Sequence, residues 1–465
     1  MVSYRPIAVA VLLALAMESF TAHAQETPPA NSDQSQNSQS QNNNPTTDNS
    51  AAEKKAKRLN TVVVSGSLIN DAQIETATPT YTITAQQIQA RGFNSVQEVL
   101  QNSVFATGAT AGGPQASGGF TQGAQTVSLY GLNPEYTLTL IDGKPITQFG
   151  QLYNGASNFN NLSNIPISMI DHIDVIPGGS SSIYGSNAIA GVVNIVTKQH
   201  MDGAEIVVRT GNYQNNGGAN QRIALSFGHD YGKLNVLGSL EFDNNSPMWA
   251  SQVPMIKNNP TMAPVAQVVN YGNPTNNPSG APIGVLSAPD GCAALHGLYH
   301  GTTVPALPPA GQTGTFCGSP QAYSDSTTIQ NFTRSYSGML KLRYDLNDHV
   351  RLYSDALVGY QIQRYNPGPS FDGTQALAYP GNNIEDLSGN ILAPLRNFAP
   401  EEVGSYSNWM QSQSDLMYQV DIGANGTFGE SDWDWDAYYL RSGDRTLTNG
   451  PVYLNAPVNA YWSSV

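Results

Sequence analysis

The sequence has little charge, and little of that charge is positive. Asp, Glu, Lys and Arg make up 12% of the 465 residues, against about 25% in ordinary soluble domains. Because 20 basic residues face 34 acidic ones, the formal net charge is −14, which argues against nucleic acid as a partner. Outside the extreme N-terminus no apolar run approaches the ~18 residues of a membrane-spanning helix. A helical membrane protein is therefore excluded, whereas a membrane β-barrel, whose strands alternate, is not.

Cysteine is scarce as well. Cys292 and Cys317 are the only two, and both stand in a Gly- and Pro-rich stretch. In an exported protein such a pair predicts a disulfide, with two free thiols as the alternative. Two cysteines are too few ligands for a structural metal site.

The residue patterns typical of enzymes are missing. The 7 histidines are scattered along the chain; His296 and His300 are four apart, but they lie in a Gly-rich loop rather than on a helix face. Neither a P-loop nor a Gly-x-Gly-x-x-Gly fingerprint occurs. We therefore expect no enzyme activity, no catalytic residue, no metal site and no cofactor.

The N-terminus predicts export. Ile7 to Met17 is a short apolar run after Arg5, and Ala22-His23-Ala24 supplies the small-x-small pattern of a signal-peptidase site. We interpret residues 1–24 as a signal peptide; a buried helix opening a soluble domain is the alternative. Residues 25–58 are polar and almost without apolar side chains, which predicts a flexible tether.

The next segment, to about Lys198, combines short helices and strands. Thr84 and Ser95 open two predicted capping boxes, and Gly92 closes the first helix. Asp142-Gly143 predicts a tight hairpin turn. The remaining elements are a β-branched run at Thr61–Val64, strands at 126–131, 136–141 and 173–176, and a helical turn at 165–172. Together they predict a small mixed α/β domain of about 140 residues.

Two runs in this segment identify a family. Leu138 to Lys144 (LTLIDGK) and Ile173 to Lys198 (IDVIPGGSSSIYGSNAIAGVVNIVTK) resemble the plug domain of TonB-dependent outer-membrane receptors. The resemblance places a TonB-box-like segment at residues 59–66 and the plug at 67–200, with an unrelated periplasmic domain as the alternative. The sequence departs from the family pattern at Tyr130-Gly131, where Arg-Gly is usual, and at Glu135, where a basic residue is frequent. The plug-motif positions are Asp142, Gly143, Gly178, Gly179, Tyr184, Gly185, Gly191 and Asn194.

Residues 201–465 alternate over long stretches. In Val350–Ile362 the even positions are mainly apolar and the odd ones mainly polar, and Tyr336–Leu346 and Leu416–Phe428 repeat the pattern. The runs are longer than the five or six residues usual for soluble strands, which favours a transmembrane barrel over a soluble sandwich. We expect about seven antiparallel strands, joined alternately by short turns and long outer loops.

The number of strands predicts a partial barrel. Plugged transporters have about 22 strands, and an open sheet cannot stand in lipid. We therefore expect this chain to be the N-terminal part of a longer receptor; a closed barrel of seven or eight strands, too narrow for the plug, is the alternative.

The resemblance implies energised import of a scarce ligand. The ligand, such as siderophore–iron, cobalamin, an oligosaccharide or a peptide, would bind the outer loop Asn244–Asn331 and the plug tips Gly108–Gln125 and Gln148–Asn160. Thr61, Val62, Val63 and Val64 would form the TonB box, which adds a strand to a TonB-type periplasmic energy-coupling protein; the alternative is that they are only the first plug strand. The other partner is outer-membrane lipid. A non-transporting adhesin or phage receptor on the same barrel is the competing function.

Overall fold

The computed structural model describes residues 80–450, apart from 107–120, 122–123, 154, 215–216, 258–264, short stretches between 271 and 326 and between 367 and 405, 430 and 432. In that part of the chain no helix has the length and apolar character needed to cross a membrane. The predicted signal peptide, tether and TonB box, and most of the plug tip at 108–125, lie outside the described residues.

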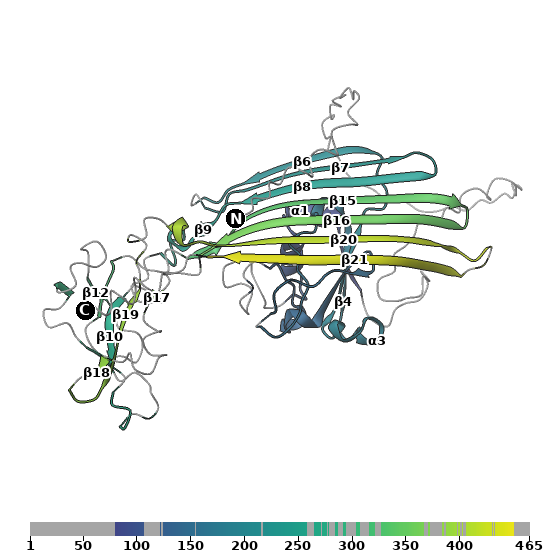
Figure 1. Ribbon diagram of the computed structural model, residues 1–465. Coiled ribbons are helices and arrows are strands. Elements are labelled where there is room, and N and C mark those ends of the chain that lie inside the picture. Colours follow the sequence, from purple (N-terminus) through teal and green to yellow (C-terminus); the bar gives the residue numbers. More distant parts are fainter. Residues whose placement is uncertain are drawn as a thin grey trace, which may run out of the picture. The chain divides into compact units, whose positions relative to one another are not determined.

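The plug contains a five-stranded sheet with the order β1-β4-β5-β2-β3 (Figure 1). β2 and β5 run parallel and every other neighbouring pair is antiparallel. All residues of β2 and β5 are buried, as expected for central strands covered on both faces. The strands are β1 (Tyr81–Thr84), β2 (Thr137–Ile141), β3 (Lys144–Pro145), β4 (Ile170–Pro177) and β5 (Gly191–Thr197).

Short helices cover this sheet: α1 (Ala85–Arg91), α2 (Val96–Gln101), α3 (Ser181–Tyr184) and the 3-10 turns Leu129–Gly131, Pro134–Tyr136, Ile167–Met169 and Ser186–Ala188. Thr84 and Gln87 form the reciprocal capping box predicted for α1, and Gly92 ends the helix in the left-handed region. At α2 only half of the predicted box forms. Ser95 accepts from Glu98 N, whereas the Glu98 carboxylate accepts from Asn94 N.

Two predicted plug elements are wrong in type or extent. Residues 126–131 are not a strand, because Tyr130 adopts a positive φ of 55° and Leu132 N bonds back to Leu129 O. The apolar side chains of that run, such as Val127 and Leu129, are buried nonetheless. The helical turn predicted at 165–172 is limited to Ile167–Met169, and strand β4 begins directly after it.

After the plug the chain forms a seven-stranded antiparallel sheet with the order β21-β20-β16-β15-β8-β7-β6. Its strands, side by side in Figure 1, are β6 (Gly203–Gly211), β7 (Asn220–Asp230), β8 (Leu234–Asn245), β15 (Phe332–Asn347), β16 (Val350–Tyr365), β20 (Gln411–Thr427) and β21 (Asp434–Asn449). β15, β16 and β20 lie where the alternation at Tyr336–Leu346, Val350–Ile362 and Leu416–Phe428 predicts strands, and all three are longer than predicted. Long registers join them, for example from Phe332↔Arg364 to Asp345↔Arg351 without interruption.

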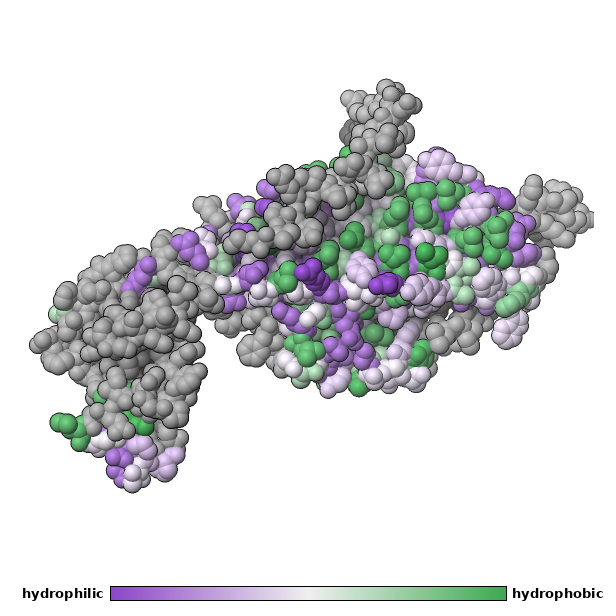
Figure 2. Space-filling view, viewed as in Figure 1, coloured by the Kyte–Doolittle hydropathy of each residue, from purple (hydrophilic) through white to green (hydrophobic). Residues whose placement is uncertain are grey.

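The polar face of this sheet is buried, and its apolar face is exposed. In β16, Asp355 and Gln361 are 7% and 3% exposed, whereas Leu352 and Val358 are 42% and 50% exposed. Hydrophobic residues accordingly gather on the visible face of the strands in Figure 2. The buried face lies against the plug, since Leu237, Met339, Leu357 and Met417 belong to the same hydrophobic cluster as the plug core. An exposed apolar face and a polar interior are the arrangement of an outer-membrane barrel.

The two long insertions contain strands that the sequence did not predict. The first, between β8 and β15, holds β9 (Met248–Trp249), the turn Ala250–Gln252, β10 (Val265–Asn270), β11 (Gly284–Leu286), β12 (Val304–Ala306), β13 (Phe316–Gly318) and β14 (Thr328–Gln330). The second, between β16 and β20, holds β17 (Phe371–Asp372), β18 (Ile384–Glu385), β19 (Ile391–Asn397) and the turn Tyr406–Trp409. β10 pairs with β19, so one sheet joins both insertions. A disulfide links Cys292 to Cys317 on β13, with the Cα atoms 5.3 Å apart.

Candidate functional site

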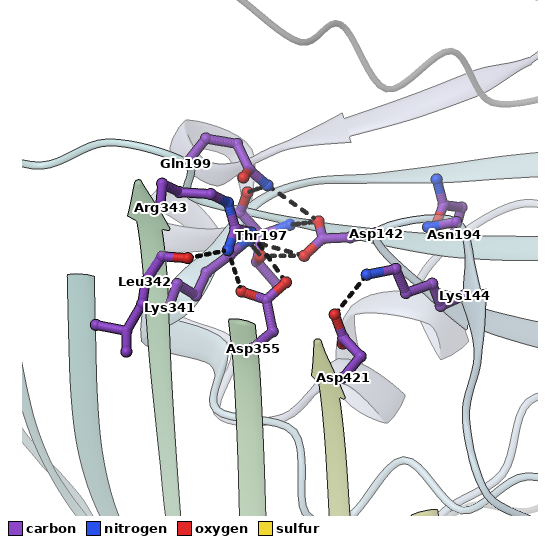
Figure 3. A network of polar contacts seen from close by, with 11 residues as sticks. Asp142, Lys144, Asn194, Thr197, Gln199, Lys341, Leu342, Arg343, Asp355 and Asp421 are labelled. Atoms are coloured by element: carbon purple, nitrogen blue, oxygen red, sulfur yellow. Dashed lines mark hydrogen bonds and ion pairs between the residues drawn. The ribbon is translucent and has the colours of Figure 1, made fainter. Parts of the chain in front are cut away.

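The plug meets the seven-stranded sheet through the tight turn between β2 and β3. Asp142 and Gly143 both have positive φ, 48° and 77°, which is the geometry of a type I′ hairpin turn. Gly143 N donates to Asn194 Oδ1 (2.9 Å), and Asp142 N donates to Ile195 O (3.0 Å). The neighbouring strand β5 therefore fixes the turn and aims the Asp142 and Lys144 side chains at the sheet (Figure 3).

Asp142 is the centre of one ion pair between plug and sheet. Its carboxylate accepts from Thr197 N (2.8 Å), from Thr197 Oγ1 (2.6 Å) and from Lys341 Nζ (2.9 Å). Lys341 lies on β15, is 1% exposed and also donates to Thr197 Oγ1 at 2.5 Å. Burial alone would raise the pKa of Asp142, but the Lys341 ammonium and the Thr197 hydrogen bonds outweigh it and hold that pKa below its ordinary value. These contacts thus favour the carboxylate form of Asp142 at its buried position.

Lys144 makes the second ion pair. Its Nζ lies 2.6 Å from Asp421 Oδ1 on β20, and both side chains are nearly buried. The ammonium also lies 4.3 Å from the ring centroid of Tyr353 and 4.9 Å from that of Tyr438, so aromatic faces add to its stabilisation. Tyr353 in turn donates to Asp436 at 2.6 Å. Lys144 is therefore held by three strands of the sheet at once.

A small cavity separates the two ion pairs. Its volume is about 10 Å³, close to the minimum for one water molecule. The Gln419 Oε1 atom is buried and without a hydrogen-bond partner, which is the kind of group that a bound water satisfies. The cavity is lined by Ile141, Asp142, Lys144, Met339, Asp355, Leu357, Gln419 and Asp421.

Uncharged polar groups of the plug bind sheet carboxylates nearer the insertions. Asn161 and Asn164 donate to Asp415 Oδ2 at 3.1 and 2.6 Å. Gly150 N donates to Asp444 Oδ1 at 2.9 Å. A Cβ at Gly150 would lie 2.8 Å from Thr446 Oγ1, so a larger residue here would require the Thr446 side chain to shift. The predicted plug tip 148–160 thus contacts β21, and the residues directly after it contact β20.

A buried carboxylate on β8 holds another part of the plug. Glu241 accepts from Ile167 N (3.4 Å) and Ser168 N (3.0 Å) in the 3-10 turn before β4. It is ion-paired within the sheet to Arg222 at 3.0 Å. The Glu241 carboxylate is thus ion-paired to Arg222 within the sheet and also accepts hydrogen bonds from two backbone N–H groups of the plug.

The other plug-motif residues shape the plug rather than its interface. Gly178 and Gly185 have φ of 92° and 87°, and a Cβ on Gly191 would collide with the Ile176 carbonyl. Gly179 lies in the same turn, beside α3, and Tyr184 packs on the small cluster around Ile176 and Val192. Gly178, Gly185 and Gly191 thus provide backbone conformations that the connection from β4 to β5 requires.

The two departures from the family pattern have their own contacts. The Tyr130 ring is half-exposed and lies edge-on to Phe105, with the centroids 6.3 Å apart. Glu135 accepts from Asn133 within the plug at 3.5 Å. In the described residues, the ion pairs between plug and sheet are made instead by Asp142 and Lys144, which are buried, and by the more exposed Lys198, whose Nζ lies 3.7 Å from Glu205 Oε2 on β6.

Sequence reasoning missed the sheet's half of this site. The charged residues concerned all lie on the polar face of the alternating strands, and that position was the signal that could have identified them. They are Lys341, Asp355, Asp415 and Asp421. Charged residues on the inner face of a predicted barrel strand have to meet water or a partner. Here the partner is the plug for Lys341, Asp415 and Asp421, whereas Asp355 pairs with Arg343 of the same sheet. The sequence does not show which plug residue each of the other three side chains contacts, because residues up to 297 positions apart come into contact.

A histidine of the plug, His172, lies between two carboxylates. His172 Nδ1 lies 2.7 Å from Asp171 Oδ2, and His172 Nε2 lies 3.6 Å from Asp174 Oδ2. Asp174 also accepts from Thr82 on β1 at 2.6 Å. The nearby Asp174 carboxylate raises the pKa of His172 to about 9, against the opposing effect of burial and with a further contribution from Asp171.

Because the folded-state pKa of His172 is above its ordinary value of 6.5, the stabilisation is complete below pH 6.5 and is lost as the pH rises through about 9. Pulse proteolysis of the receptor in urea should show the plug becoming less stable over that interval. His172→Gln should remove this dependence, and the exposed control His229→Gln should keep it. A plug whose stability does not change with pH in the wild type would contradict the prediction.

The chain is similar to a known protein family in part of its sequence and to several solved structures. Residues 72–192 match the family model described as TonB-dependent Receptor Plug Domain, which confirms the resemblance seen in the sequence. Among solved structures, the chain is similar to the ferric enterobactin receptor of Pseudomonas aeruginosa, at 17% identity and a TM-score of 0.46, over 80% of this chain and 41% of that one. It is similar to the siderophore receptor PirA of Acinetobacter baumannii at 14% identity and a TM-score of 0.44, over 79% and 40%. The chain thus spans about two-fifths of the length of these receptors.

Proposed function

Since residues 72–192 are a plug domain of the TonB-dependent receptor family, we propose that the protein is an outer-membrane receptor that imports a scarce ligand into the periplasm. The ligand binds at the outer face, and a TonB-type periplasmic protein supplies the work that displaces the plug. The ends of the strands that carry the long insertions face the exterior, and the tight turns face the periplasm.

The observation that carries this proposal is the polar contact between plug and sheet. Asp142–Lys341, Lys144–Asp421 and the amide contacts to Asp415 hold the plug in place. Paired polar groups can exchange their partners for water at a small net cost, whereas groups left unpaired in the interior are expensive. Such an interface is stable at rest and can rehydrate as the plug moves, which suits a closure that has to be opened repeatedly.

We further propose that the pull enters through the segment before β1. Thr61–Val64 would pair with the periplasmic partner as an added strand. β1 is the first described strand after this segment, and its register with β4 covers only the four pairs from Tyr81↔Val175 to Thr84↔His172. A short edge pairing opens at a lower free energy than the central strands, so β1 would separate before the buried β4–β5–β2 core does.

The ligand classes under this proposal are siderophore-bound iron, cobalamin, an oligosaccharide or a peptide. Labelled ligands of each class should be offered to cells with and without the receptor, and both equilibrium binding and uptake should be measured. Import predicts receptor-dependent accumulation that stops when the inner-membrane proton gradient is dissipated, while binding persists. Binding of a ligand without energised accumulation would favour the non-transporting alternative and reject the transport proposal.

A further inference from the structure

The face of the sheet that is turned away from the plug carries charge of one sign only. In β15, β16, β20 and β21, the register places four charged residues on this face, and all four are exposed arginines: Arg334, Arg364, Arg441 and Arg445. The Asp and Glu residues of these four strands lie on the opposite, plug-facing alternation. An otherwise apolar face with unneutralised cations predicts an anionic partner.

Arg334, Arg364 and Arg445 lie in the half of their strands nearer the long insertions, whereas Arg441 lies near the middle of β21. A tilted aromatic pair, Phe242 and Tyr336 with ring centroids 5.2 Å apart, lies on the same face, and Tyr336 is the direct partner of Tyr360. Arg334 and Arg364 are two and four positions farther toward the insertions than these tyrosines. Aromatic girdles mark the boundary of the hydrocarbon region, so the two arginines lie at the level of the lipid headgroups.

Arg334 and Arg364 are organised around one ring. Their guanidinium carbons lie 5.4 and 5.6 Å from the centroid of Phe332, close enough for cation–π attraction. Arg334 Nε donates to Asn244 Oδ1 at 3.0 Å, which fixes the plane of its guanidinium. The terminal amino groups of Arg334 can then donate side by side to two oxygens of one anion, the geometry in which arginine binds phosphate.

We propose that the cluster Arg334–Phe332–Arg364 binds the phosphate of an anionic lipid headgroup in the outer leaflet, an inference that rests on the outer-membrane location proposed above. Two like charges on one ring repel each other, and an anion between them removes that cost. A free phosphate would satisfy the guanidinium groups alone. A lipid also covers the exposed apolar side chains deeper on the same face, such as Leu340 and Val358, with its acyl chains.

The test uses the receptor purified in detergent and placed in phosphatidylcholine nanodiscs that contain a small fraction of a phosphorylated glycolipid. Native mass spectrometry would count the retained lipid for the wild type and for the double variant Arg334→Gln/Arg364→Gln. We expect the double variant to bind the lipid roughly 10- to 30-fold more weakly. Arg334→Lys/Arg364→Lys should fall in between, because it keeps the charge and loses the planar fork.

Arg351→Gln is the matched control, since Arg351 pairs with Asp345 at the tight-turn end of the sheet and should bind lipid as the wild type does. Equal retention of the dephosphorylated glycolipid, or undiminished binding by the double glutamine variant, would overturn the proposal. Full displacement of the lipid by inorganic phosphate would replace it with a site for the free anion. Since lipid retention is measured without transport, a receptor that binds the lipid but imports no ligand would refute only the proposed function.

Discussion

Val63→Pro is expected to abolish energised uptake while ligand binding stays at the wild-type level. Strand addition to the periplasmic partner uses backbone N–H and C=O groups in an extended segment. Proline removes the donor and fixes φ, so it is tolerated only at sheet edges and bulges. Val63→Thr keeps both the donor and a β-branched side chain and should retain most of the uptake.

The measurement is uptake and equilibrium binding on the same cells, in the full-length receptor, normalised to surface abundance. If Thr61–Val64 were only a structural strand of the plug, proline would instead lower abundance, stability and binding together. Normal uptake by Val63→Pro at normal abundance would reject the TonB-box assignment. The threonine variant separates a need for backbone pairing from a need for valine itself.

Lys341→Met is expected to loosen the plug by about 3–5 kcal/mol, the range for removing one partner of a buried ion pair. The loss leaves Asp142 buried at the plug–sheet contact without its cation, although Thr197 still donates to it. Methionine retains most of the lysine's apolar volume, so the change is mainly one of charge. The expected consequence is a plug that opens without energy input and a membrane that leaks large solutes.

The double variant Asp142→Asn/Lys341→Met should recover much of the lost stability, because it removes both charges rather than one. Lys233→Met is the matched control: Lys233 is exposed and donates only to Leu346 O at 3.4 Å among the described residues. Hydrogen exchange of the 137–147 segment in the intact receptor, with the permeability of cells to a large antibiotic, measures both effects. If Lys341→Met exchanged its 137–147 amide hydrogens as slowly as the wild type, the ion pair would not hold the plug. The same conclusion would follow if the double variant exchanged them as fast as the single variant.

The plug and the strands were predictable because their signals are local. The alternation in Val350–Ile362 marks both faces of β16, and Asp142-Gly143 needs only its own backbone preferences to form a hairpin. The same local reasoning explains the wrong strand at 126–131. Its β-branched and apolar residues favour extension, but Tyr130 N bonds to Phe105 O and the chain turns there. A tertiary hydrogen bond overrode the local preference.

The insertions show a second limit of local reasoning. The outer segments between β8 and β15 and between β16 and β20 have weak strand signals one by one. Their strands form because β10 and β19, which belong to different insertions, supply each other's hydrogen-bond partners. A pairing between segments more than a hundred positions apart leaves no periodic trace in either of them.

The sequence by itself determined the class of the molecule: a plug motif and strands with one polar and one apolar face. These follow from the order of neighbouring residues, since side-chain direction in a strand has a period of two. Only the tertiary structure decided that Lys341 meets Asp142, that Lys144 meets Asp421, and that Arg334 and Arg364 share one ring. Those contacts depend on strand register and on how the plug docks, and both are set by packing summed over the whole interface rather than by any local run of residues.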